Sequence, residues 1–266
     1  MLTNKVVAIT GGTDGIGKAL VKQAIHEGAM VATCGRNPEK LQALKEEFDG
    51  KNILILACDV AREDDCKNFI AQTLHKFGGI DILINNAGVS MRSLFKDVST
   101  ETMRRLMETN FWGSVYCTRF AIDSIIERKG TVVGVSSIAG YRGLPGRSGY
   151  SASKFAMHGW LEALRTELLD SGVNVMWVCP GFTQSNVRRA ALTSDSSEQG
   201  ESPMQEEKLM TAEESALHIW KAIKKRKRTL VLTYQGKQTV FLNKLFPALT
   251  DKLTKNFFFK NGKLVK

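Results

Sequence analysis

Long apolar runs are missing from this sequence, and cysteine is scarce in it. No segment reaches about 18 uninterrupted apolar residues, the length that a membrane-spanning helix needs. The N-terminus enters a short apolar run without the hydrophobic stretch of a secretory signal, so we expect a cytoplasmic protein. The five cysteines are an odd number without metal-ligand spacing, and the four histidines form no cluster. These absences predict reduced thiols, no disulfide framework and no metal site.

Apolar sequence is nevertheless sufficient for one large core. The chain has 266 residues, of which 43% are hydrophobic, and this favours a single doubly wound α/β domain over two small ones. Alternation of short apolar runs with helical patterns predicts right-handed βαβ units and a parallel sheet with helices on both faces. The expected strands are residues 5–10, 29–34, 52–57, 80–84, 130–136, 173–179 and 229–234. The expected helices are residues 15–28, 38–48, 62–77, 99–128, 149–171 and 211–227.

A glycine-rich turn follows the first expected strand. It lies immediately before a helical pattern and has the sequence Gly11-Gly12-Thr13-Asp14-Gly15-Ile16-Gly17. A helix N-terminus presents unpaired N–H groups, and glycines let a pyrophosphate approach the backbone closely. The spacing is Gly-x-x-x-Gly-x-Gly, which differs from the general dinucleotide fingerprint. A bland glycine turn is the alternative, but the strand before it and the helix after it favour a dinucleotide site.

Tyr150 and Lys154 lie four residues apart in an expected helix, so their side chains share one face. A phenol titrates near pH 10, too high for easy proton exchange at neutral pH. A neighbouring ammonium favours the phenolate, so we expect Lys154 to lower the pKa of Tyr150. Taken alone, the pair is more typical of a solvated helix face. Together with the glycine turn, it indicates acid–base chemistry beside a bound nucleotide.

These motifs resemble those of the short-chain dehydrogenases/reductases, in order from about residue 4 to residue 185. The resemblance implies a single-domain Rossmann fold with a parallel sheet of about seven strands. It implies a catalytic set of Asn110, Ser137, Tyr150 and Lys154, with Ser137 preferred to Ser136 because it lies thirteen residues before the tyrosine. The implied cofactor contacts are Gly11, Thr13, Asp14, Gly15, Ile16, Gly17, Asp59, Val60, Asn86, Ala87, Gly88, Tyr150, Lys154, Pro180, Gly181 and Thr183.

The roles that the resemblance implies are those of hydride transfer between a nicotinamide and a carbonyl or alcohol. Tyr150 is then the general acid or base, Ser137 binds the substrate oxygen, and Lys154 binds the nicotinamide ribose. Asn110 holds a water that links Lys154 to solvent. The substrate is a small molecule, with lipophilic 3-oxoacyl, sterol and long-chain keto compounds left unranked. A second hypothesis is a nucleotide-binding regulatory or assembly protein whose catalysis is vestigial. Relatives commonly form dimers or tetramers, so a homo-oligomer is expected.

The end of the second expected strand bears on the choice between NAD(H) and NADP(H). An NAD enzyme places a carboxylate there for the ribose hydroxyls, whereas a 2′-phosphate is repelled by that charge and attracted by arginine. Gly35 occupies the position of the acid, and Arg36 follows it. We therefore expect Arg36 to contact the cofactor and NADP(H) to be preferred. Asp14 departs from this pattern, because many NADP(H)-dependent relatives carry a basic residue there.

Beyond residue 185 the resemblance weakens and the sequence becomes polar. Residues 1–236 are expected to form the Rossmann domain, with a short helix beginning near 186–192 and a mobile substrate lid over 186–210. Residues 237–266 are expected to form a basic, amphipathic C-terminal extension that Pro247 kinks or splits.

Positive charge is concentrated at the C-terminus. Residues 221–266 hold 13 Lys or Arg and one acid, whereas the whole chain carries +10. Basic and apolar faces together favour peripheral contact with an anionic membrane through this extension. The alternative is a helix packed on the domain or on a partner subunit, with its lysines in solvent. No nucleic-acid reader motif is present, so nucleic acid is not an expected partner.

Overall fold

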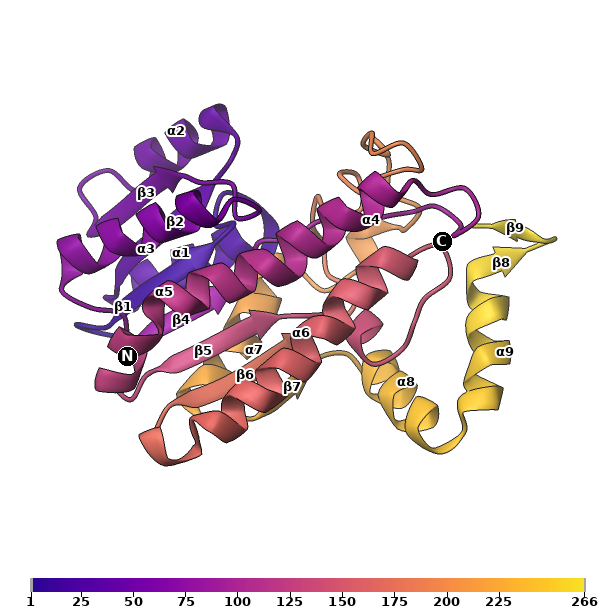
Figure 1. The fold of residues 1–266 in the computed structure, drawn as a ribbon. Helices are drawn as coiled ribbons and strands as arrows, with labels where there is room; N and C mark the ends of the chain where they lie inside the picture. Colours follow the sequence, from indigo (N-terminus) through magenta and orange to yellow (C-terminus); the bar gives the residue numbers. More distant parts are fainter. Residues whose placement is uncertain (1, 266) are drawn as a thin grey trace.

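The computed structural model describes residues 2–265 and is built on a seven-stranded parallel sheet (Figure 1). The strand order is β3-β2-β1-β4-β5-β6-β7, which reverses direction between β1 and β4. The strands are β1 (Val6–Thr10), β2 (Met30–Gly35), β3 (Ile53–Ala57), β4 (Ile82–Asn85), β5 (Thr131–Val135), β6 (Asn174–Cys179) and β7 (Thr229–Val231). In such sheets the strand ends at the reversal form a crevice that binds ligands.

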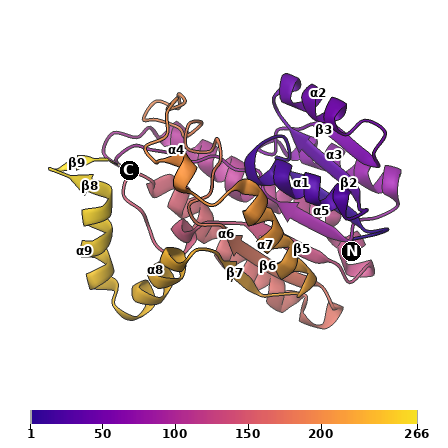
Figure 2. The same ribbon diagram turned by 180° about the vertical axis from the view of Figure 1, so that it is seen from behind.

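Helices cover both faces of the sheet. The face seen in Figure 1 carries α3 (Glu63–Phe77), α5 (Gly113–Glu127) and α6 (Ser148–Glu167). The opposite face, seen in Figure 2, carries α1 (Gly15–His26) and α7 (Ala212–Lys224), while α2 (Pro38–Glu47) contributes to the same core. Because strand side chains alternate, Val7 and Ile9 of β1 join the α1 side, and Val6 and Ala8 join the α3 side. A strand buried on both faces needs apolar residues throughout, as β1 has.

The predicted doubly wound fold is confirmed, and most expected elements lie within a few residues of the observed ones. The expected helix over 99–128 is observed as one unbroken helical stretch, in which a π-helical turn over Glu108–Trp112 lies between α4 (Thr100–Met107) and α5. The expected helix start at 186–192 is wrong, because these residues form turns. All five cysteines are buried and unpaired in the structure.

The C-terminal segment forms two helices that project from the sheet domain (Figures 1 and 2). They are α8 (Tyr234–Leu245) and α9 (Pro247–Phe258), followed by a separate two-stranded antiparallel sheet of β8 (Phe259–Lys260) and β9 (Lys263–Leu264). Pro247 occupies the first turn of α9, so the split that proline predicts is observed. We call α8 and α9 together the terminal hairpin. Within residues 2–265, every helix is too short or too polar to span a bilayer.

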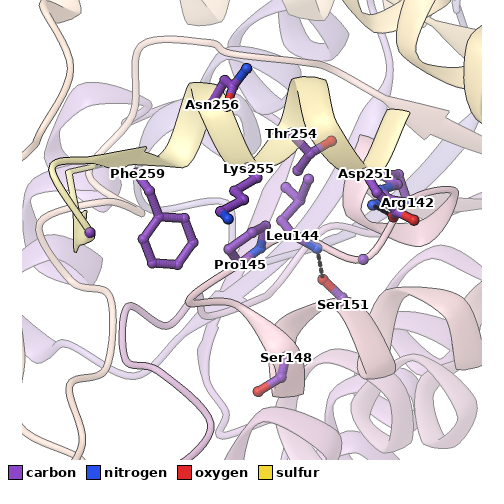
Figure 3. Close-up of a pocket in the computed structure, with 12 residues that line it drawn as sticks. Arg142, Leu144, Pro145, Ser148, Ser151, Asp251, Thr254, Lys255, Asn256 and Phe259 are labelled. Carbon is purple, nitrogen blue, oxygen red and sulfur yellow. Dashed lines mark hydrogen bonds and ion pairs between the residues drawn. The ribbon is translucent and has the colours of Figure 1, made fainter. Parts of the chain in front are cut away.

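Polar contacts join the terminal hairpin to the loop before α6. Arg142 forms an ion pair with Asp251 of α9, and its Nη1 donates to Asn243 Oδ1 of α8 at 3.1 Å. Asn243 Nδ2 in turn donates to the carbonyl of Tyr141 at 3.0 Å. Figure 3 shows an open cavity of about 860 Å³ between α9 and this loop, with Arg142 and Asp251 at one end. The hairpin is therefore attached to the domain beside the start of α6.

Candidate active site

A cavity of about 500 Å³ opens at the carboxyl ends of the central strands. We call it the cofactor cleft. All seventeen residues that the sequence assigned to the cofactor line it, although they come from segments up to 172 residues apart (Gly11 to Thr183). The fold therefore brings together the glycine turn, Arg36, the Asp59-Val60 and Asn86–Gly88 segments, the Tyr150–Lys154 pair and the turn after β6.

The glycine turn leaves no room for side chains at its close contacts. A Cβ on Gly17 would lie 2.1 Å from the Gly11 carbonyl oxygen and 2.4 Å from Asn86 Nδ2. Gly11 and Gly15 have φ values of +68° and +48°, which L side chains rarely adopt. Asp14 caps α1 by accepting from the Gly15 N–H at 2.7 Å. The turn therefore exposes backbone N–H groups at the N-terminus of α1, with no side chains in the way. Such a surface suits the pyrophosphate of a dinucleotide.

Thr10 and Asn86 connect the ends of β1 and β4. Thr10 Oγ1 accepts from the N–H groups of Asn86 and Ala87, each at 3.0 Å. Asn86 Nδ2 donates to the carbonyls of Thr10 and Gly11 at 2.9 and 3.1 Å. These bonds fix the floor of the cofactor cleft where the strand order reverses.

Asn110 is fully buried in the π-helical turn between α4 and α5. Its Nδ2 donates to the Val89 carbonyl and to Ser153 Oγ, both at 2.9 Å, and its Oδ1 accepts from the Val89 N–H at 2.8 Å. Such π-turns are frequent at functional sites, where they redirect a helix. A Cβ on Gly88 would lie 3.1 Å from Asn110 Oδ1 and 3.6 Å from Lys154 Nζ, so the asparagine and the lysine flank the same glycine.

Lys154 does not act on Tyr150 as the sequence predicted. Its Nζ donates to the Val135 carbonyl at 2.8 Å and lies 5.8 Å from the centre of the Tyr150 ring. Burial lowers the pKa of Lys154 to about 8. Burial raises the pKa of Tyr150, opposed by a hydrogen bond with Ser137 and by the charges of Arg147 and Arg188. The expectation that Lys154 lowers this pKa is therefore wrong, because burial prevails and the charges that oppose it are those of two arginines.

The two serines at the end of β5 have different surroundings. Ser136 is buried, and its Oγ lies 2.7 Å from His158 Nε2. Ser137 Oγ accepts from the Ala139 N–H at 3.2 Å, lines the cofactor cleft and bonds Tyr150. This geometry supports the choice of Ser137. Burial lowers the pKa of His158 to about 4, which keeps its ring neutral beside Ser136.

Two cations lie where the adenosine ribose of a dinucleotide is expected. Arg36 is 49% exposed, and its Nη1 lies 3.8 Å from Asp59 Oδ2. Lys40, in the first turn of α2, forms an ion pair with Asp14 and also lines the cofactor cleft. Lys40 has no signal in the sequence, because only the packing of α2 beside the glycine turn brings it there. Its ammonium offsets the Asp14 carboxylate that would otherwise repel a phosphate.

A second cavity, of about 400 Å³, adjoins the cofactor cleft and shares Ser137 and Tyr150 with it. We call it the apolar cavity. Its far wall is formed by the terminal hairpin, through side chains that include Leu242, Leu253 and Phe257. The apolar periodicity of this segment is visible in the sequence. Which of its side chains line the cavity together with Tyr150 is not.

Residues 181–210 form the segment between β6 and α7, and its first part, between residues 181 and 198, contributes to the lining of both cavities. Buried Arg188 bonds Glu206 through Nε (2.6 Å) and Nη2 (2.5 Å), and Nη2 also donates to the Thr183 carbonyl at 2.7 Å. The pKa of Glu206 is lowered, mainly by its hydrogen bonds with Arg188. Isolated bridges join Met91 to Leu192 and Thr183 to Met210. We call these residues the cover segment.

Comparison with known proteins identifies related sequences. The sequence model described as "short chain dehydrogenase" matches residues 5–196. Over 256 residues the chain is 34% identical to mouse "Dehydrogenase/reductase SDR family member 7B", covering 93% of this chain and 79% of the mouse protein. It is also 34% identical over 201 residues to "11-beta-hydroxysteroid dehydrogenase" of Pinus massoniana, covering 74% of this chain and 56% of that protein.

Solved structures agree with the fold. A short chain dehydrogenase/reductase from Burkholderia phymatum in complex with NAD has a TM-score of 0.83 at 20% identity, covering 93% of this chain and 95% of that one. The closed form of a serine dehydrogenase complexed with NADP⁺ has a TM-score of 0.77 at 28% identity, covering 85% and 94%. The first similarity concerns the fold alone.

Proposed function

The chain belongs to the short-chain dehydrogenase family, and we propose that it is an NADP(H)-dependent oxidoreductase that interconverts a ketone or aldehyde with an alcohol. One observation carries this proposal: Tyr150 and Ser137 line both the cofactor cleft and the apolar cavity. A proton donor and a hydrogen-bond donor thus lie where a nicotinamide and a substrate carbonyl would meet.

Each catalytic side chain then has a defined task. The bound nicotinamide supplies or accepts the hydride. Tyr150, which burial keeps protonated, donates its proton to the substrate oxygen during reduction and removes one during oxidation. Ser137 donates a hydrogen bond to the oxygen on which negative charge develops. Lys154 binds the ribose hydroxyls from its position on the Val135 carbonyl, and Asn110 orders the water path behind it.

The preference for NADP(H) is supported by the two cations near the expected ribose. Arg36 is half exposed and can reach a 2′-phosphate, while Lys40 neutralises Asp14. Similar solved structures hold NAD in one case and NADP⁺ in another, so they support a nicotinamide cofactor without ranking the two.

A lipophilic substrate is supported by the lining of the apolar cavity, to which both helices of the terminal hairpin contribute apolar side chains. The pine relative is named as a hydroxysteroid dehydrogenase, which fits a substrate of this kind. We further propose that the cover segment is a lid that orders on binding. Hydrogen exchange over residues 186–210 should then slow when NADPH and a ligand are added, and exchange rates that do not change would contradict the lid.

We also propose a homo-oligomer and a peripheral membrane contact for a protein located in the cytoplasm. Trp112 in the π-turn and Phe155 on α6 are exposed on helices through which relatives commonly pair. Phe241, Phe246 and Leu249 are exposed on the terminal hairpin, which also carries lysines. An exposed apolar face with basic neighbours suits an anionic bilayer surface.

The proposed activity is tested by NADPH oxidation across a panel of carbonyl compounds. Tyr150→Phe should lower kcat/KM by about 10²- to 10⁴-fold, the usual contribution of a general acid, while the Kd for NADPH changes little. Tyr116→Phe, a matched change outside both cavities, should leave both values unaltered. NADPH binding without turnover of any carbonyl would instead favour a regulatory, nucleotide-binding protein. Failure to bind NADPH or NADH would reject both hypotheses.

A further inference from the structure

The apolar cavity contains a guanidinium group that has no carboxylate partner among the described residues. Arg147 immediately precedes α6 and lines this cavity. Its Nη1 donates to Ser90 Oγ at 3.3 Å, and its Nε is buried without a hydrogen-bond partner within residues 2–265. Burial lowers the pKa of Arg147, and the charges of Arg188 and Arg92 lower it further. Burying a cation without a partner costs free energy, and a bound anion would offset that cost.

Other charged groups nearby do not supply that anion. Arg188 also lines the cavity, but Glu206 and the Thr183 carbonyl already satisfy it. Within the described part of the chain, no Asp or Glu lines the apolar cavity. The cavity therefore combines apolar walls with an uncompensated positive charge. Such a combination suits a ligand that has an anionic end and an aliphatic chain.

The position of Arg147 fixes where that anionic end must lie. Arg147 is the N-cap residue of α6 and Tyr150 lies in its first turn, and both residues line the apolar cavity. A group bound by the guanidinium is thus a few atoms from a carbonyl at Tyr150 and Ser137. At the far wall, Leu242 and Phe257 of the terminal hairpin offer apolar contact to a chain.

We propose that the substrate is an aliphatic oxo acid whose carboxylate is held by Arg147. Its carbonyl faces Tyr150 and Ser137, and its chain lies against α8 and α9. The carbonyl carbon accepts hydride from NADPH and its oxygen takes the Tyr150 proton, which gives a hydroxy acid and NADP⁺. This inference rests on the proposed function and narrows it, because a sterol or an uncharged long-chain ketone leaves Arg147 unpaired.

Binding of two probes of equal chain length tests the inference without turnover. The Kd values of dodecanoate and dodecanol are measured by calorimetry on the full chain saturated with NADPH, whose own binding is followed by its fluorescence. A charge-assisted contact with Arg147 should make dodecanoate bind about 10- to 100-fold more tightly than dodecanol. Equal affinities would overturn the proposal. Absence of NADPH binding in the same samples would instead reject the proposed function.

Three variants locate the effect at Arg147. Arg147→Gln should reduce the preference for dodecanoate to less than about threefold while the Kd of dodecanol stays constant, and Arg147→Lys should restore part of it. Arg119→Gln removes the same charge at an exposed position of α5 that lines neither cavity, and should keep the full preference. A preference that survives in Arg147→Gln would overturn the assignment. Thermal unfolding of each variant shows whether it is folded.

Discussion

The cofactor cleft and the apolar cavity share Tyr150 and Ser137 but are built in different ways. The floor of the cleft consists of strand ends, tight glycines and backbone groups that the sheet fixes, and part of the cover segment lies over it. The cavity has one wall from the sheet domain and another from the terminal hairpin and the cover segment. Binding of a common cofactor therefore depends on main-chain geometry, whereas the choice of substrate depends on side chains from less regular segments.

Among substitutions that act on ligand binding, filling the space at Gly17 should have the largest effect. Gly17→Ala would place a Cβ against the Gly11 carbonyl and Asn86, so the turn must open. Overpacking of this kind costs about 1–3 kcal/mol, and we expect NADPH affinity to fall by about 100-fold. Gly159→Ala in α6 is the matched control, because no atom lies within 4 Å of its added Cβ. NADPH fluorescence titration gives the Kd of both variants. Unaltered affinity in Gly17→Ala would show that the glycine turn accommodates a side chain and would contradict this prediction.

Acid should weaken the sheet domain through His158. Its pKa is about 4 in the folded protein, against 6.5 for the free side chain, so protons favour the unfolded chain between these values. Stability is therefore retained above pH 6.5 and lost as pH falls toward 4, by about 3 kcal/mol from this residue. Denaturant unfolding measures the free energy of unfolding at each pH. Between pH 6.5 and 4, this free energy should fall by about 3 kcal/mol less in His158→Gln than in the wild type. His75→Gln, at an exposed position on α3, should keep the wild-type pH dependence.

We expect Arg36 to distinguish NADPH from NADH. Replacing it with alanine should weaken NADPH binding by about 10-fold, since one charge-assisted contact is lost, and should leave NADH binding nearly constant. Arg62→Ala is a suitable control, because Arg62 pairs with Asp65 outside the cofactor cleft. If Arg36→Ala weakened NADH and NADPH equally, the arginine would be a structural residue and not a selector.

Substitutions on the outer face of the terminal hairpin should have the smallest effect, a modest loss of binding to anionic vesicles. Phe241 and Phe246 are 62% and 55% exposed, so only part of each ring remains to be buried in a bilayer. We expect the full chain to sediment with anionic vesicles, less so at high salt, and a Phe241→Ser/Phe246→Ser variant to bind a few-fold less. Leu217→Ser, exposed on α7, is the control. No sedimentation of the wild type, together with a variant that dissociates into smaller species, would assign this face to a partner subunit.

The same contrast explains what could be predicted from the sequence. The sheet and the cofactor cleft follow from local signals, because apolar runs, tight glycines and the Tyr150–Lys154 spacing act within a few residues of one another. The π-turn at Asn110 has no periodic signal, since one extra residue in a helical turn leaves the apolar pattern nearly intact. Lys40 and the apolar cavity depend on packing between distant segments. The direction of the Tyr150 pKa shift was mispredicted, because sequence spacing identifies neighbours along a helix but does not show that both side chains are buried.

The ion pair between Arg142 and Asp251 joins residues more than a hundred positions apart and attaches a short terminal module beside finished catalytic machinery. The wall that this module supplies can therefore diverge among descendants without disturbing hydride or proton transfer. Exchanging residues 234–258 between paralogues should transfer preference for one alkyl shape to another, so new substrate specificities can arise in this module.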